Sequence, residues 1–156
     1  MTQHLKEFVG VEIDTTSTFA DMTTLRVGGK PRYTVRCSNA DAASFVVRVL
    51  DSENIPLVIV GDGSNLLVAD ASMGQADLDY VVVSLDFPHI QVNQDSGIVR
   101  AGAGANWDKV VAEAVDAGLG GIECLSGIPG RAGAVPVQNV GASGAEVSDV
   151  LPRVRL

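Results

Sequence analysis

The sequence is poor in the features that mark membrane, nucleic-acid-binding and secreted proteins. It has no apolar run of about 18 residues, so a transmembrane helix is not expected. Its first residues lack the basic and then apolar order of a signal peptide. Basic side chains are few, 11 against 19 acidic ones, and the net charge of -8 argues against a general nucleic-acid or anionic-membrane surface. We therefore expect no nucleic-acid partner and no membrane span, although a local pocket could still take an anion.

Cysteine and histidine are equally scarce, with two of each. Cys37 and Cys124 lie far apart in apolar surroundings, which predicts reduced core residues of a cytoplasmic protein rather than a disulfide. H-E-x-x-H and C-x-x-C do not occur, so a metal site is not expected. The phosphate-binding G-x-x-x-x-G-K-[ST] loop and the nucleophile elbow G-x-S-x-G are absent too, and no repeat of 20 to 50 residues is present.

What the sequence has in excess is glycine. Seventeen glycines in 156 residues is above the usual share of about 7%. Eleven of the 17 lie between residues 97 and 156, so the excess is local and indicates a backbone under special geometric demand. With 46% hydrophobic residues, the chain is long enough for one domain or two small lobes around a hydrophobic core.

Hydrophobic spacing and end signals predict an α/β chain, with strands and helices mixed along it. Two helices are predicted, one over residues 40–52 capped by Ser38 or Asn39, and one that begins after Asn106 and ends at Gly118. The apolar run 57–60 is typical of a strand buried on both faces. The other predicted strands cover residues 33–37, 80–84, 90–93 and 97–101, with a turn at 95–97, a loop around 73–79 and the opening of a strand at 151–156.

The predicted organisation is an N-terminal arm over residues 1–22, which we expect to be loosely packed, followed by two lobes. The first lobe covers residues 23–80 and the second, incomplete, lobe covers 81–156.

Three glycine-containing segments are candidates for binding chemistry. The segment 61–65 follows a buried strand, and its amides with Ser64 and Asn65 suit a phosphate oxygen, but a plain tight turn explains it as well. Asp62 argues mildly against an anion there. The turn 101–107 half resembles a dinucleotide fingerprint, but the third glycine would fall at Trp107, so a Rossmann fold is excluded and a structural turn is favoured.

The third segment, residues 126–144, has one charged residue, Arg131, and almost no period. Its small residues allow close approach to a flat ligand, and Gln138 and Asn139 could pair with the polar edge of a heterocycle. The alternative is an interior loop that a neighbouring domain covers.

Taken in order, these motifs resemble the UDP-N-acetylenolpyruvoylglucosamine reductase (MurB) family of flavoproteins. The residues that carry the resemblance are 23–29 (TTLRVGG), 61–67 (GDGSNLL), 101–104 (AGAG) before Trp107, 126–130 (SGIPG) and 136–142 (PVQNVGA). The resemblance implies the two-lobed FAD-binding fold of the vanillyl-alcohol oxidase and p-cresol methylhydroxylase type, which is not a Rossmann fold. Other FAD domains, those of oxidases and molybdenum hydroxylases, share that fold but lack the match over 136–144. After Gly-Ala the family usually has Tyr, whereas this chain has Ser143.

The resemblance also implies the cofactor and its contacts. Residues of the 61–66 segment would hold the FAD pyrophosphate, and residues of 127–142 would line the dinucleotide and the flavin ring. The implied cofactor-binding set is Gly61, Asp62, Gly63, Ser64, Asn65, Leu66, Gly127, Ile128, Pro129, Gly130, Gly133, Ala134, Gln138, Asn139, Gly141 and Ala142.

In the family, NADPH reduces FAD and the flavin passes hydride to an enolpyruvyl double bond, with a serine, an arginine and a glutamate assisting. We expect those three residues, and a C-terminal substrate-binding domain for the UDP-sugar, to lie beyond Leu156, so no catalytic residue is assigned. The resemblance places the protein in the cytoplasm, in peptidoglycan synthesis and therefore in cell shape and division. A non-catalytic FAD-binding module with the same fold is the alternative. Either way, a poorly covered 126–144 segment predicts that FAD stabilises the chain.

Overall fold

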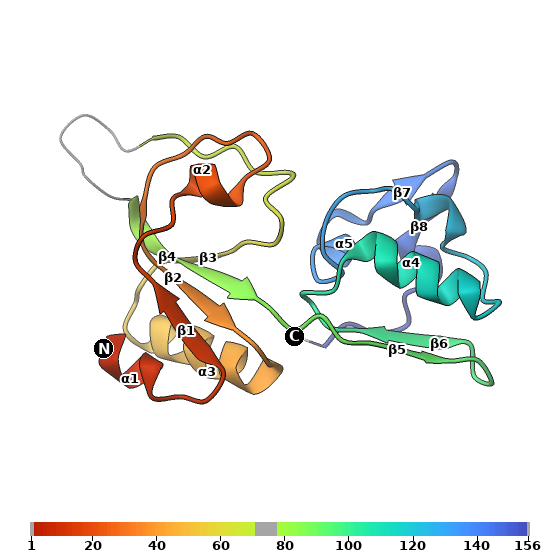
Figure 1. Ribbon diagram of the computed structural model, residues 1–156, viewed down its shortest axis with the longest axis horizontal. Coiled ribbons are helices and arrows are strands. Elements are labelled where there is room, and N and C mark those ends of the chain that lie inside the picture. Colours follow the sequence, from red (N-terminus) through yellow and green to blue (C-terminus); the bar gives the residue numbers. More distant parts are fainter. Residues whose placement is uncertain (1, 71–77, 156) are drawn as a thin grey trace. The chain divides into compact units, whose positions relative to one another are not determined.

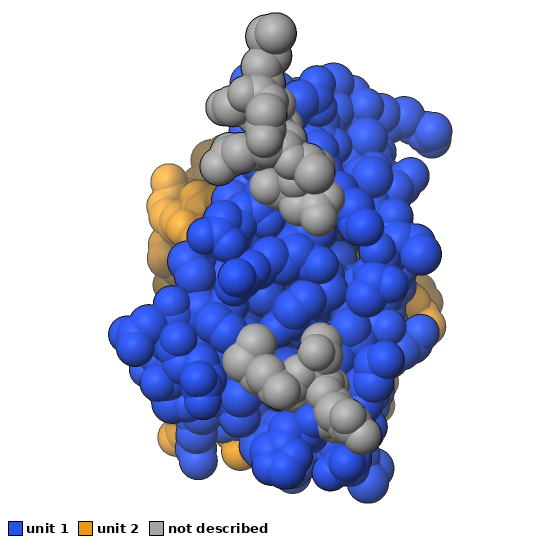
Figure 2. Space-filling model, turned by 90° about the vertical axis from the view of Figure 1, so that its left-hand side faces the viewer, with its two compact units in different colours: residues 1–87 blue, residues 88–156 orange. Residues whose placement is uncertain are grey.

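The computed structural model describes residues 2–70 and 78–155, and it divides the chain into two compact units, residues 1–87 and 88–156. Figure 2 colours these units blue and orange. Both mix helices and strands, as the sequence predicts for an α/β chain. The division falls after the strand that ends at Leu85, whereas the expected lobe boundary, between residues 80 and 81, lies inside that strand.

Unit 1 is built on a four-stranded mixed sheet. Its strands are β1 (Val11–Asp14), β2 (Pro31–Cys37), β3 (Leu57–Ile59) and β4 (Leu78–Leu85), in the order β1-β2-β4-β3. β1 runs antiparallel to β2, whereas β2 and β3 both run parallel to β4. The helices of this unit are α1 (Thr2–Lys6), α2 (Phe19–Met22) and α3 (Ala40–Ser52), and α3 provides the crossover from β2 to β3 (Figure 1).

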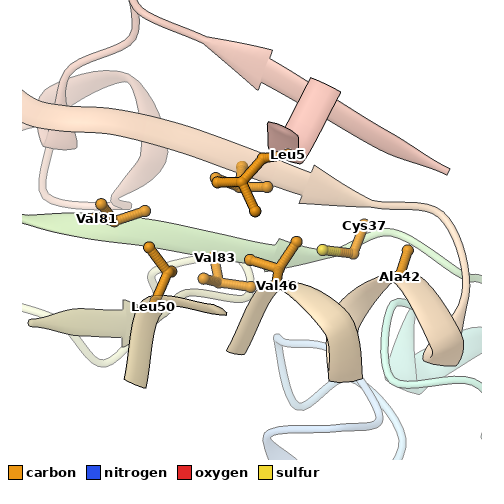
Figure 3. Close-up of a cluster of buried hydrophobic side chains, with 8 residues drawn as sticks. Leu5, Cys37, Ala42, Val46, Leu50, Val81 and Val83 are labelled. Atoms are coloured by element: carbon orange, nitrogen blue, oxygen red, sulfur yellow. The ribbon is translucent and has the colours of Figure 1, made fainter. Parts of the chain in front are cut away.

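The core of unit 1 lies between α3 and the sheet. Ala42, Val46 and Leu50 are fully buried at the i, i+4 spacing of one helix face. Val46 and Leu50 lie against Val81 and Val83 of β4, and Ala42 lies beside Cys37 of β2 (Figure 3). The intervening Val82 belongs to a second cluster with Phe19 and Val60, because successive strand residues face opposite sides of a sheet. Both faces of β4 are therefore covered.

Local signals predicted α3 correctly. Asn39 is its N-cap, and its side-chain oxygen accepts a hydrogen bond from the Ala42 amide at 2.8 Å. The strands predicted at 33–37 and 80–84 correspond to β2 and β4. The loop expected around 73–79 lies mostly outside the described residues, and its last two residues belong to β4.

Two expectations for unit 1 were wrong. The first 22 residues are not loosely packed, because Leu5 and Phe19 are fully buried and β1 pairs with β2. Thr18 and Asp21 form a capping box that starts α2 and orients Phe19 toward the core. The 57–60 run is not buried on both faces: β3 ends the described sheet, and Ile59 is 53% exposed.

Unit 2 is a hairpin followed by a helix and short irregular elements. The hairpin consists of β5 (Ile90–Asn93) and β6 (Ile98–Ala101), and its turn includes Gly97 with a positive φ. α4 (Trp107–Asp116) begins at the N-cap Asn106, as predicted. The elements that follow are η1 (Glu123–Leu125), α5 (Val135–Gln138), β7 (Gly141–Ala142), β8 (Ala145–Glu146) and η2 (Val147–Asp149).

The core of unit 2 gathers side chains from α4 and from the segment after it. Trp107 is 6% exposed, and its indole nitrogen donates to the Leu125 carbonyl oxygen at 3.0 Å. Leu125, Val135 and Val147 are buried with it. The apolar but aperiodic segment is thus folded around the first turns of α4.

Two expectations for the cysteines and the chain end were also wrong. Cys37 is buried in the unit 1 core, but Cys124, in η1, is exposed. Residues 151–155 form no strand. Among the described residues, no helix is long and apolar enough to cross a membrane.

Candidate functional site

The 61–66 turn follows β3 and Val60, whose amide donates to the Val83 carbonyl oxygen at 3.0 Å. Gly63 lies at φ +59° and is buried. A Cβ at this position would overlap with the Met22 carbonyl oxygen and lie 2.8 Å from the Thr23 Cα. Glycine is therefore required here by both backbone conformation and space, because the turn packs backbone to backbone against residues 22–24.

The segment 23–29 is thereby a neighbour of the 61–66 turn. The Thr24 amide donates to the Gly63 carbonyl oxygen at 3.3 Å, and the buried Thr23 hydroxyl donates to the Val27 carbonyl oxygen at 3.2 Å. Gly28, at φ +112°, lies under Phe19, where a Cβ would come within 2.6 Å of the phenylalanine Cβ. Two motifs that sequence reasoning treated separately thus pack against each other in unit 1.

Most of the 61–66 turn faces outward. Gly61, Asp62, Ser64 and Asn65 are exposed, whereas Leu66 is half-buried. Leu66 lines an apolar pocket of about 290 Å³, together with Phe19, Pro56, Leu57, Val58, Val68 and Tyr80. That volume is near the lower end of the usual range for small-molecule sites.

In unit 2, the glycine-rich turn 101–106 and the start of the aperiodic segment lie side by side. The amides of Ala132 and Gly133 donate to the carbonyl oxygens of Ala105 and Ala103, at 2.8 Å and 3.0 Å. A Cβ on Gly133 would lie 2.7 Å from the Ala103 Cβ. Glycine is therefore required at position 133 because the backbone packs closely against Ala103 there.

Residues 126–130 are held from the first turn of α4. The Asp108 carboxylate accepts hydrogen bonds from the Ser126 hydroxyl and the Gly127 amide, both at 2.7 Å. These bonds, the Ser126 bond foremost, lower the pKa of the Asp108 carboxyl below its ordinary value of 3.8. Asp108 is absent from the predicted set. From the sequence, Asp108 could be placed in the first turn of a helix that begins after Asn106. The sequence could not show that its carboxylate reaches residues 126 and 127.

Gly127 and Gly130 differ from Gly63 and Gly133. Their φ angles are +77° and +135°, and a Cβ on either would meet nothing within 4 Å. The fold alone leaves the space on that side open, so a planar group could approach this backbone closely. Gly97, Gly118 and Gly144 have the same open space, so this feature permits a flavin or its dinucleotide at Gly127 and Gly130 but does not by itself select them.

Asn139 has bonds within the chain at both ends of its amide. Its nitrogen donates to the Glu146 carboxylate at 2.7 Å, and its oxygen accepts from the Ser148 amide at 3.1 Å. Its backbone is left-handed, with φ +44°. Asn139 therefore shapes the turn between α5 and β7, which qualifies the expectation that its side chain pairs with a heterocycle edge.

Gly141 and Ala142 form β7, which pairs with β8 through a two-residue turn at Ser143 and Gly144. Ser143 is exposed and left-handed, with φ +54°. The aromatic residue that the family usually has at this position would therefore begin on the outside of the turn, and its absence opens no gap in the unit 2 core.

The predicted set is divided between the two units. Residues 61–66 belong to unit 1, and the remaining residues, from Gly127 to Ala142, belong to unit 2.

Comparison with known proteins identifies the family. The model of the FAD binding domain family matches residues 31–156. UDP-N-acetylenolpyruvoylglucosamine reductase 2 of Corynebacterium glutamicum is 55% identical over 156 residues, which are 100% of this chain and 41% of that protein. The corresponding reductase of Corynebacterium diphtheriae is 58% identical over 139 residues, 89% of this chain and 36% of that protein.

A solved structure is similar as well. The crystal structure of MurB from Thermus caldophilus matches with a TM-score of 0.67 and 29% identity, over 92% of this chain and 47% of that one. The chain spans about two-fifths of the length of the first curated relative, which is 41% covered. On the match over residues 31–156 and on these identities, the chain belongs to the FAD binding domain family, with the vanillyl-alcohol oxidase type of fold, and is a homologue of the FAD-binding portion of UDP-N-acetylenolpyruvoylglucosamine reductase.

Proposed function

We propose that this chain binds FAD as the cofactor-binding part of an NADPH-dependent UDP-N-acetylenolpyruvoylglucosamine reductase of bacterial peptidoglycan synthesis, working in the cytoplasm. The names of the relatives and the extent of the family match support this assignment. The structural observation that carries it is the open space beside the backbone of Gly127 and Gly130, which lie in the part of the chain that the family match covers.

The two groups of predicted residues would have different tasks. In the 61–66 turn, the pyrophosphate would be held by the amides of Gly61 and Gly63 and by the polar side chains of Ser64 and Asn65. Leu66 would contribute its apolar side chain to the same turn. The missing side chain of Gly63 would serve the fold and not the ligand, because the space that a Cβ would take is filled by Met22 and Thr23.

The 127–142 group would line the flavin and the rest of the dinucleotide. Its members are Gly127, Ile128, Pro129, Gly130, Gly133, Ala134, Gln138, Asn139, Gly141 and Ala142. Gly133 and Asn139 would contribute by shaping the segment, since both are engaged within the chain. Bound FAD supplies hydride-transfer chemistry, and the protein supplies binding and orientation. The UDP-sugar and its reduction belong to the longer protein.

The direct test compares two glycines in similar conformations. Gly127 and Gly144 lie at φ +77° and +83°, and a Cβ on either meets nothing within 4 Å. Each Gly→Ala change therefore costs a similar conformational strain, about 1–2 kcal/mol. Only Gly127 belongs to the proposed cofactor set.

The measurement is FAD titration followed by flavin fluorescence, with urea unfolding of the same proteins. We expect wild-type and G144A protein to bind FAD with similar Kd and G127A to bind at least about tenfold more weakly, at similar loss of stability. Failure of the wild-type chain to retain any FAD would contradict the proposal. Equal Kd for both variants would remove Gly127 from the site.

The finer assignment to the reductase has a separate test. The remainder of the Corynebacterium glutamicum relative, supplied in trans to the FAD-loaded chain, should restore NADPH oxidation that depends on UDP-N-acetylglucosamine enolpyruvate. No NADPH oxidation in the presence of that substrate, while FAD stays bound, would favour a non-catalytic FAD-binding module. NADPH oxidation that does not depend on the substrate would contradict the assignment to the reductase.

A further inference from the structure

The first turn of α4 contacts both ends of the segment 125–130. At one end, the Trp107 indole donates to the Leu125 carbonyl oxygen at 3.0 Å. At the other end, the Trp107 amide donates to the Gly130 carbonyl oxygen at 3.0 Å. The segment thus leaves α4 and returns to it within six residues.

Asp108 contacts the middle of the segment 125–130. A single carboxylate oxygen, Oδ1, accepts from both the Ser126 hydroxyl and the Gly127 amide at 2.7 Å. Such short bonds to a charged acceptor are among the stronger hydrogen bonds in proteins. Gly127 lies at φ +77°, a conformation from which a flexible glycine could readily depart. A fixed Gly127 amide therefore depends on an acceptor placed where Asp108 stands.

We propose that Asp108 is a positioning residue for FAD, which holds Ser126 and Gly127 so that the open side of the 127–130 backbone is presented in one conformation. This inference rests on the proposed function. The effect of Asp108 on FAD would pass through the backbone of Ser126 and Gly127, because its Oδ1 is bonded to these two residues. Without Asp108, the binding of FAD would also have to order residues 126–130, and this would lower the affinity.

An acidic residue in the first turn of a helix also stabilises that helix through its dipole. That role requires no partner at residues 126 and 127, and it would be lost in any variant without the charge. The two roles therefore predict different results for the D108N variant. Its side-chain amide would keep a neutral Oδ1 acceptor for both donors while losing the charge.

The experiment measures FAD Kd by flavin fluorescence, urea unfolding, and hydrogen exchange of the Gly127 amide in FAD-free protein. The variants are D108A, D108N, S126A and the double variant D108A/S126A. The control is D116A, which removes an exposed acidic charge at the other end of α4.

We expect D108A to raise the FAD Kd about tenfold and to speed Gly127 exchange by a similar factor. D108N should stay within about threefold of wild type, S126A should lie between wild type and D108A, and D116A should match wild type. The double variant should bind no more weakly than D108A, because both changes break the same contact. S126A decides the question if D108A does not fold, since Ser126 is exposed.

Wild-type FAD binding with an unchanged Kd in D108A and S126A would overturn this inference and leave the proposed function standing. An asparagine variant as weak as D108A would also overturn it, since a charge effect alone would then suffice. If the wild-type chain takes up no FAD, the proposed function fails, and this inference fails with it.

Discussion

Replacing Gly133 with alanine is expected to destabilise unit 2 through a steric overlap. The added Cβ would lie 2.7 Å from the Ala103 Cβ and 3.1 Å from the Ala103 Cα and carbonyl oxygen. Gly133 is not in the left-handed region, so strain of the backbone conformation contributes nothing. Overpacking of this kind costs about 1–3 kcal/mol. The two segments are joined by a hydrogen bond between Gly133 and Ala103, so they cannot separate without losing it.

Urea unfolding followed by tryptophan fluorescence measures this cost in unit 2 alone. The chain has one tryptophan, Trp107, which is buried in that unit. The matched control is G120A, because Gly120 also lacks a positive φ and its nearest neighbour is a Glu123 carboxylate oxygen at 3.9 Å. G120A should be neutral or slightly stabilising, by less than about 1 kcal/mol.

The compensating change is A103G, which removes the methyl group that the new side chain of G133A would meet. Alone it should cost about 0.5–1 kcal/mol, through added backbone freedom. In the double variant A103G/G133A, we expect the total cost to fall short of the sum of the single costs by about 1 kcal/mol, since one overlap is relieved. Strict additivity, or a G133A variant as stable as wild type, would refute the packing argument.

Three further outcomes follow from single groups. Burial raises the pKa of the Cys37 thiol to about 11, whereas Cys124 is exposed, so a thiol reagent should label one cysteine in the native chain and the second only on unfolding. Hydrogen bonds, chiefly from the Ser17 hydroxyl, lower the pKa of the Asp14 carboxyl below 3.8. The contribution of Asp14 to stability is therefore full above about pH 4 and is lost as the pH falls further. The D14N variant should lack this part of the acid sensitivity in urea titrations from pH 6 to 2. S143N should raise the free energy of unfolding by about 0.5–1 kcal/mol, because asparagine is favoured at the left-handed first position of a two-residue hairpin turn.

The elements that sequence reasoning located are those with local signals. α3 and α4 begin at Asn39 and Asn106, whose side chains cap the amides three residues later. An apolar helix face and a cap are both within one window of sequence, so neither depends on distant residues. The β5–β6 hairpin was predicted for the same reason.

The errors concern features that depend on distant partners. The N-terminal residues looked polar and aperiodic, yet Leu5 is buried in the cluster of α3 and the sheet, and Phe19 is buried in a cluster with the distant Val60 and Val82. The apolar run at 57–60 showed that β3 is hydrophobic, but the position of a strand within a sheet is not a property of that strand. The exposure of Cys124 could not be predicted either, because the sequence around η1 has no hydrophobic period.

For the candidate site, the limit of sequence reasoning lies in what each glycine is for. Gly63, Gly133, Gly127 and Gly130 all belonged to one predicted cofactor set. The structure separates them: at Gly63 and Gly133 the missing side chain makes room for the protein's own backbone and for Ala103, whereas at Gly127 and Gly130 the same space is open. A sequence records that a Cβ is absent but not what would have met it. Substitutions of Gly63 or Gly133 are therefore expected to change stability before they change cofactor binding. Only substitutions of Gly127 or Gly130 test cofactor binding directly.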